Sequence, residues 1–200
     1  MGGKYLNQNL EIEFKNMLTE ADYTKIFEAE FAADDQQKII QSNYYYDTTD
    51  RLLKQQNSAL RIRKTPTFNE LTLKVPSQGF LLETNISLSD NECSALLNAN
   101  HIKLSDITSD IMIKDLKPDS EFYLFNQFET IRYEKDMDGH LLVLDQTTFQ
   151  NGVVDYELEL ESQSPEAGLI FFNSFLEKHA IKKRKALPKI ARAERFKDMI

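Results

Sequence analysis

Cysteine, glycine and proline are scarce in this 200-residue sequence, which contains one, six and five of them respectively. A lone cysteine, Cys93, allows no internal disulfide, so a reducing cytoplasm is the expected compartment. The low glycine and proline content leaves no room for a long flexible linker, and the length suits one domain over residues 1–200. Apolar runs such as residues 168–172 are far shorter than the roughly 20 residues that cross a bilayer. We therefore expect no membrane insertion.

Positive charge is also in short supply. The 24 Lys and Arg residues face 32 Asp and Glu residues, which gives a formal net charge of −8. Such a chain lacks the broad basic surface of non-specific nucleic-acid binding, so we expect no nucleic-acid partner, and nothing indicates an obligate protein partner. No glycine-rich phosphate loop of the Walker kind is present, which excludes a P-loop mechanism. Any anion site must be a local concentration of cations.

Apolar and polar residues alternate with period two in eight short stretches, which is typical of strands. These stretches cover residues 10–16, 41–47, 58–65, 69–75, 81–88, 128–135, 140–146 and 153–161. The turn dipeptides Asp138-Gly139 and Asn151-Gly152 predict hairpins and a mostly antiparallel sheet. Capping patterns predict helices that begin after Thr19, Ser89 and Ser164, and a last helix is expected over Lys189 to Lys197. The mixture favours an α+β fold.

One face of most predicted strands carries charge, and the charges are sorted by sign. Acids gather near both ends of the chain and cations in its middle: Glu11, Glu13, Asp155, Glu157, Glu159 and Glu161 against Arg61, Arg63, Lys74 and Arg132. An open sheet with a solvated ionic face would explain each strand by itself, and this alternative stays open. Eight such strands closed into a barrel would place the ionic faces inside and the apolar faces outside, under the helices. A polyanion bridged to the carboxylates by Mg²⁺ or Mn²⁺ would then fill the lumen.

The order of these residues resembles the CYTH superfamily, also called triphosphate tunnel metalloenzymes. Residues 11–15 match its ExExK signature, and the later features follow in the family's order: Tyr45-Tyr46-Asp47-Thr48, Leu60-Arg61-Ile62-Arg63, Lys74, Arg132, Asp145, the Glu157/Glu159 pair and Lys189. The segment Leu82-Glu83-Thr84 suggests the YjbK-like bacterial branch. Leu81 departs from the pattern, because many members carry an arginine there, and its loss weakens the case for a bulky nucleotide substrate.

The resemblance implies an eight-stranded antiparallel closed barrel, a tunnel with helices packed outside, which binds a triphosphate and a divalent metal. It assigns metal binding to Glu11, Glu13, Asp145, Glu157 and Glu159, and phosphate binding to Lys15, Arg61, Arg63, Lys74, Arg132 and Lys189. Arg192 is a further candidate phosphate ligand at helical spacing from Lys189, although it would equally fit a solvent-facing position. Asp145 rests on the resemblance alone, because its strand is apolar on both faces.

The leading hypothesis is a metal-dependent triphosphatase that hydrolyses inorganic triphosphate or an organic triphosphate such as thiamine or nucleoside triphosphate. A ring of Arg and Lys with a metal ion would neutralise the charge of the transition state. Three means of activating the attacking water stay open: Lys74, a lumen-facing tyrosine of Tyr44-Tyr45-Tyr46, with Tyr44 and Tyr46 as the candidates, or a metal-bound hydroxide. The alternatives are a class IV-type adenylate cyclase and a non-catalytic module that binds polyphosphate or a triphosphate. Each takes a small-molecule triphosphate as its partner.

Overall fold

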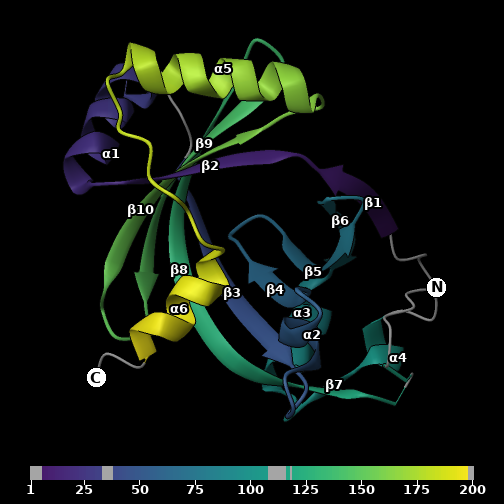
Figure 1. The fold of residues 1–200 in the computed structure, drawn as a ribbon. Helices are drawn as coiled ribbons and strands as arrows, with labels where there is room; N and C mark the ends of the chain where they lie inside the picture. The colour runs from purple at the N-terminus through teal and green to yellow at the C-terminus, as the bar shows by residue number, and fades with distance from the viewer. Residues whose placement is uncertain (1–5, 33–37, 108–115, 118, 198–200) are drawn as a thin grey trace. The chain divides into compact units, whose positions relative to one another are not determined.

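The computed structural model describes residues 6–32, 38–107, 116–117 and 119–197 (Figure 1). Its strands are β1 (Leu6–Glu11), β2 (Glu13–Leu18), β3 (Ile39–Asp47), β4 (Ala59–Lys64), β5 (Asn69–Ser77), β6 (Phe80–Leu88), β7 (Ile102–Lys103), β8 (Glu121–Met137), β9 (His140–Phe149) and β10 (Val154–Glu161). Its helices are α1 (Glu20–Ile26), a π-helical turn η1 (Phe27–Phe31), α2 (Leu52–Gln55), α3 (Asp90–Asn98), α4 (Leu104–Ile107), α5 (Pro165–Lys178) and α6 (Lys189–Lys197). Among the described helices, none has the length and apolar composition needed to span a bilayer.

The strands are ordered β1-β6-β5-β4-β3-β8-β9-β10-β2, with β7 paired to β8 outside this path. The α+β class and the antiparallel sheet are confirmed. The closed eight-stranded barrel is wrong in detail. The first predicted stretch is interrupted at Ile12, so β1 and β2 are separate strands that pair with different partners, β6 and β10. In the described part of the chain the path therefore has nine strands and two ends.

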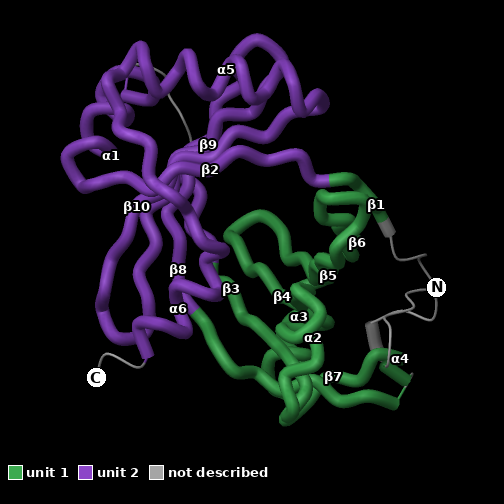
Figure 2. Tube along the Cα trace, viewed as in Figure 1, with its two compact units in different colours: residues 1–10, 42–127 green, residues 11–41, 128–200 purple. Residues whose placement is uncertain are grey.

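The chain divides into two compact units, each assembled from distant segments (Figure 2). Unit 1 comprises Met1–Leu10 with Ser42–Gln127, and unit 2 comprises Glu11–Gln41 with Phe128–Ile200. Each has its own apolar core and its own ionic sheet face. The expectation of a single domain over residues 1–200 stays a prediction.

In unit 1, α2 packs on β4 and α3 packs on β5 and β6. The apolar sides of these strands supply the core, which includes Leu60, Ile62 and Leu71 and surrounds the buried Cys93. Helix α3 begins where the sequence predicts. The Ser89 hydroxyl accepts a hydrogen bond from the Glu92 amide, and the Glu92 carboxylate accepts one from the Ser89 amide. Two backbone amides at the start of the helix, those of Ser89 and Glu92, are satisfied in this way.

In unit 2, helices α1 and α5 cover the apolar side of β2 and β10. Leu158 and Leu160 are fully buried there, together with Phe172 from α5. The close approach of α5 depends on Gly168, where a Cβ would lie 2.6 Å from Cε2 of Phe14. The alternation read from the sequence therefore places the apolar faces under helices in both units, as expected.

Two hairpin turns use the positive φ angles that tight turns require. Asp138 and Gly139 join β8 to β9 with φ of 55° and 79°, as predicted. Gln78 and Gly79 join β5 to β6 with φ of 49° and 86°. At the predicted turn dipeptide Asn151-Gly152 only Gly152 has a positive φ, and the connection between β9 and β10 is a longer loop.

Candidate functional site

The strand register of unit 2 arranges charged side chains in rows on the face opposite the helices. Residues directly paired across neighbouring strands point to the same side of a sheet. Three rows result, running across the strands of the unit: Arg132, Asp145 and Glu157; then Glu134, Val143, Glu159 and Lys15; then Asp136, Leu141, Glu161 and Glu13. Six of the metal and phosphate candidates thus share one face of unit 2: Glu13, Lys15, Arg132, Asp145, Glu157 and Glu159.

Arg132 holds two of the carboxylates. Its Nε donates to Oδ1 of Asp145 at 2.8 Å, and its Nη2 donates to Oδ2 of Asp145 at 2.6 Å and to Oε2 of Glu159 at 2.9 Å. Asp145 is fully buried, and its neighbour Val143 is buried on the same strand. The bidentate guanidinium makes the buried Asp145 tolerable on this otherwise apolar strand.

Helix α6 supplies two further cations to this face. The Lys189 ammonium lies 2.9 Å from Oδ2 of Asp145, 2.5 Å from Oε2 of Glu157 and 2.7 Å from Oε1 of Glu159. One turn later, Nε of Arg192 donates to Asp155 at 2.6 Å and its Nη2 to Glu157 at 2.9 Å. Arg192 is buried, so the solvent-facing alternative for this residue is excluded.

These contacts shift the pKa values of the buried carboxyl groups of Asp145 and Glu159. Burial alone would raise the pKa of the Asp145 carboxyl, but Arg132 and Lys189 outweigh it and hold that pKa below its ordinary value. For Glu159, burial is outweighed by Lys15, Lys189 and Arg132, so its pKa lies well below the usual range. Both groups are therefore carboxylates, the form that binds a cation.

The residues of the ExExK signature lie on two strands, β1 and β2. On β2, the Lys15 ammonium lies 2.8 Å from Glu13 and 3.3 Å from Glu159. Glu13 pairs in register with Glu161. Burial raises the pKa of the Glu161 carboxyl above its ordinary value, because this effect is larger than the lowering by Arg132. Glu11 is the last residue of β1, on the other side of the interruption at Ile12, and its metal role stays a prediction.

Among the described residues, no group of three or more His, Cys, Asp or Glu side chains has the arrangement of a metal site. The carboxylates of Asp145, Glu157 and Glu159 converge instead on the Lys189 ammonium. Hard, anionic oxygens of this kind are the donors that Mg²⁺ and Mn²⁺ prefer. The donor set therefore fits a divalent cation chemically.

Unit 1 carries a second ionic face with the same row pattern. One row joins Asn43, Arg63 and Glu70, the next joins Tyr45, Arg61, Thr72 and Asn85, and a third joins Ala59, Lys74 and Glu83. Lys74 forms an ion pair with Glu83. Burial would raise the pKa of the Glu83 carboxyl, but Lys74 lowers it below its ordinary value. The three predicted cations of this unit thus share one face.

Neutral groups orient the two arginines. Nη2 of Arg61 donates to the Thr72 hydroxyl at 3.1 Å, and that hydroxyl donates to Glu70 at 3.1 Å. Nε of Arg63 donates to the amide oxygen of Asn43 at 3.2 Å. Nε of Arg61 is buried and has no partner within the described part of the chain. A buried donor without an acceptor is costly, and a phosphate oxygen would satisfy it.

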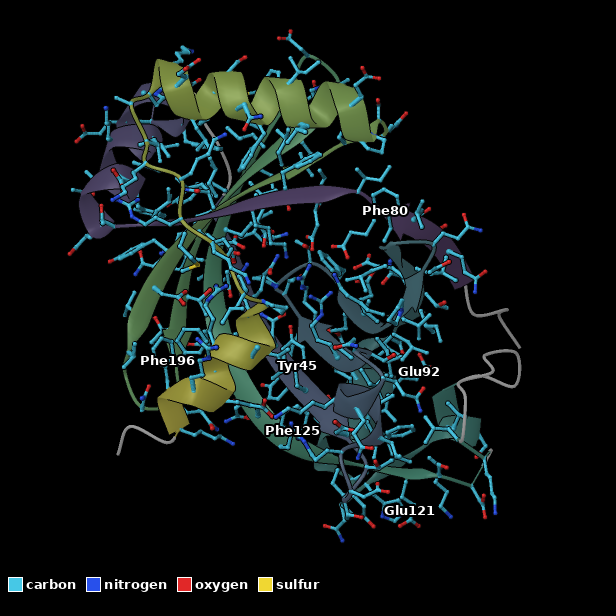
Figure 3. The ribbon with its side chains drawn as sticks, in the orientation of Figure 1. Tyr45, Phe80, Glu92, Glu121, Phe125 and Phe196 are labelled. Carbon is cyan, nitrogen blue, oxygen red and sulfur yellow. The ribbon has the colours of Figure 1, made fainter. Side chains whose placement is uncertain are left out.

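Tyr44 and Tyr46 lie on the wrong face for chemistry. Tyr46 is 2% exposed in the apolar core of unit 1, and Tyr44 packs against the same core. Burial raises the pKa of Tyr46 to about 12. Tyr45 is the tyrosine that shares the face of Arg61, with which it pairs in register, and it is labelled in Figure 3. The expectation that Tyr44 or Tyr46 faces the ionic side is therefore wrong.

Sequence reasoning missed Tyr45, Asn43 and Glu70 as members of the ionic face of unit 1. A run of three tyrosines has no alternation, and Asn43 and Glu70 carry no signature of their own. Their position follows from the register with β4, which pairs Tyr45 with Arg61. Period two along residues 69–75 would have placed Glu70 on the face of Lys74, whereas Asn43 and Tyr45 required the register with β4.

Comparisons with known proteins concern the family and the fold of this chain. The family model of the CYTH domain matches residues 9–193. YjbK of Bacillus subtilis, named as a candidate triphosphatase, is 34% identical over 188 residues, which cover 94% of this chain and 95% of that protein. A Bacillus halodurans structure described as a candidate adenylate cyclase has a TM-score of 0.80 at 30% identity and covers 92% of this chain and 97% of its own. The Hippeastrum protein HpAC1, described as a candidate adenylyl cyclase with a dominant triphosphatase activity, shares the fold at a TM-score of 0.75 and 21% identity, over 94% of this chain and 95% of its own.

Proposed function

The chain belongs to the CYTH domain family, and from this premise we propose that it is a divalent-metal-dependent triphosphatase. Its substrate would be inorganic triphosphate or an organic triphosphate such as thiamine or nucleoside triphosphate. The observation that carries the proposal is the convergence of Asp145, Glu157 and Glu159 on one cation position. The triphosphatase name of the Bacillus subtilis relative supports the same class.

In unit 2, we assign Asp145, Glu157 and Glu159 to Mg²⁺ or Mn²⁺, with Glu11 and Glu13 as further ligands. A bound divalent ion supplies Lewis-acid charge to phosphate oxygens and favours ionisation of water. Three cations of the unit, Lys15, Arg132 and Lys189, already lie at hydrogen-bond or ion-pair distance from these acids. They would bind phosphate oxygens and offset the charge that develops in phosphoryl transfer.

In unit 1, Arg61, Arg63 and Lys74 are the proposed phosphate ligands. Arg61 is the best supported, because its buried Nε lacks an acceptor and its Nη2 is held by a neutral hydroxyl. Lys74 is paired with Glu83, which favours a role in binding over one as a base. Tyr45 replaces Tyr44 and Tyr46 as the tyrosine available on this face.

A phosphate-release screen tests the proposal. Tripolyphosphate, ATP and thiamine triphosphate would each be incubated with Mg²⁺ or Mn²⁺ and with a chelator. We expect phosphate release from at least one triphosphate and loss of release with the chelator. Tight binding without release under every metal condition would contradict hydrolysis and favour a binding module.

A cyclase is the second candidate, because the Bacillus halodurans protein, 30% identical to this chain, is described as a candidate adenylate cyclase. A cyclase would convert ATP into cyclic AMP and pyrophosphate, whereas hydrolysis of the terminal anhydride yields ADP and phosphate. Chromatography of the products of ATP separates the two reactions.

Tripolyphosphate with Mg²⁺ is expected to stabilise the protein strongly. At a concentration a hundredfold above its Kd the ligand should add about 2.7 kcal/mol to the free energy of unfolding, which corresponds to a Tm rise of roughly 5–10 °C for a chain of this size. Orthophosphate should add far less, since it offers fewer oxygens to the cations. Equal shifts from both anions at matched concentration, measured by calorimetry, would indicate an unspecific anion effect.

Replacing Arg61 by Met is expected to weaken tripolyphosphate binding by about 10- to 100-fold, because a charge-assisted contact to an anion is lost. The Tm without ligand should change little, since the hydrogen bond of the Arg61 guanidinium goes to a neutral hydroxyl, and Glu83 keeps its ion pair with Lys74. Titration calorimetry of this variant beside Arg195→Met, a change at an exposed position of α6, measures the difference. Similar affinity in both variants would remove Arg61 from the site.

A further inference from the structure

We propose that Lys189 and the divalent cation compete for the same three carboxylates, so that metal binding releases the first residue of α6 from the sheet. The inference rests on the proposed function in taking Mg²⁺ or Mn²⁺ as the ligand. The Lys189 ammonium is within 2.9 Å of one oxygen each from Asp145, Glu157 and Glu159, and its side chain is only 12% exposed. Three anionic oxygens around one positive centre already form a cation site, and its occupant belongs to the chain itself.

A second cation cannot simply be added at this position. Like charges repel strongly at contact distance in a buried site. The other carboxylate oxygens are also engaged. Arg132 takes Oδ1 of Asp145 and Oε2 of Glu159, while Arg192 donates to both oxygens of Glu157. A metal ion that binds these groups must therefore displace an existing partner.

Lys189 is the partner that leaves at least cost. Arg132 lies within β8 and holds Asp145 with two hydrogen bonds of fixed geometry, whereas Lys189 has a flexible four-carbon chain and is the first residue of α6. The far end of α6 is anchored separately. The ring of Phe196, labelled in Figure 3, lies 5.0 Å from that of Phe149, and the Asn151 side chain donates to the Phe196 carbonyl at 2.9 Å.

The exchange connects two roles for one residue. Without metal, Lys189 adds a further positive charge to buried acids that Arg132 and Arg192 also hold. Once displaced, its ammonium is available for phosphate oxygens, beside the ion that took its place. Metal would therefore bind before the triphosphate, and the vacated ammonium would add to the affinity for the anion.

Lysine labelling of the unchanged protein tests the exchange. Reductive methylation followed by peptide mass spectrometry reports the accessibility of each ammonium group. We expect Lys189 to react slowly without metal and about fivefold faster or more with saturating Mg²⁺, since displacement exposes it. Lys178, whose side chain is 64% exposed, serves as the control and should react at the same rate in both states. An unchanged or slower rate at Lys189 at metal concentrations that saturate binding would overturn the proposal.

A variant gives the second test. Lys189→Met removes the competitor, so titration calorimetry should show Mg²⁺ binding about tenfold tighter than in the unchanged chain. Lys178→Met removes a lysine that forms an ion pair with Glu30, and this control variant should leave the affinity for Mg²⁺ unchanged. Equal or weaker binding in folded Lys189→Met would make Lys189 a structural counter-ion and overturn the inference. If this variant does not fold, the labelling of the unchanged protein decides. Neither test measures hydrolysis, so a chain that passes both but releases no phosphate would refute only the proposed function.

Discussion

Replacing Leu158 by Asp is expected to lower the free energy of unfolding by several kcal/mol. Leu158 is fully buried on β10 in the apolar core of unit 2. A carboxylate there would have no cation or water, which costs several kcal/mol, and natural domains have only about 5–15 kcal/mol of stability to lose. The neighbours Glu157 and Glu159 are equally buried, yet they are tolerated because they point to the opposite face, where Lys189 meets both.

Urea unfolding followed by circular dichroism measures this effect. Leu169→Asp is the matched control, because Leu169 is 49% exposed on α5 and should lose little stability. Equal stability of the two variants would mean that the apolar face of β10 is not buried under helices. The assignment of the ionic face as the functional side of the sheet would then fail as well.

Replacing Glu157 by Gln is expected to lower kcat/KM for the preferred triphosphate by at least about 100-fold. Glu157 is 1% exposed and receives hydrogen bonds from Lys189 and Arg192. Glutamine keeps the size and one acceptor oxygen, so the fold should persist, whereas the negative charge that attracts a metal ion is lost. Excess Mg²⁺ should restore part of the activity, since mass action offsets weaker affinity.

Steady-state kinetics at limiting and at saturating metal measure this loss. Glu166→Gln, at an exposed position in the first turn of α5, is the control and should retain full activity. Normal turnover of Glu157→Gln at limiting metal would contradict the role of Glu157 as a metal ligand.

The sequence by itself determined most of the strands, the starts of helices α1, α3, α5 and α6, and the chemical character of each sheet face. Period-two alternation predicted that Leu158 and Leu160 face the core while Glu157 and Glu159 do not, and the structure confirms this. Helix α6 begins at Lys189 and ends at Lys197, as expected. Membership of the CYTH domain family was also readable, because the order of motifs along the chain is itself sequence information.

Only the tertiary structure decided which charges meet. Asp145, Glu157 and Lys189 meet although they lie on β9, β10 and α6. No local sequence pattern gives the distances between these side chains. The same holds for Arg192, which is buried against Asp155, and for the pairing of Tyr45 with Arg61. The direction of a side chain along a strand is a local property of the backbone, so period two reveals it. The partner of that side chain depends on strand register and on helix docking, which contacts between distant segments establish.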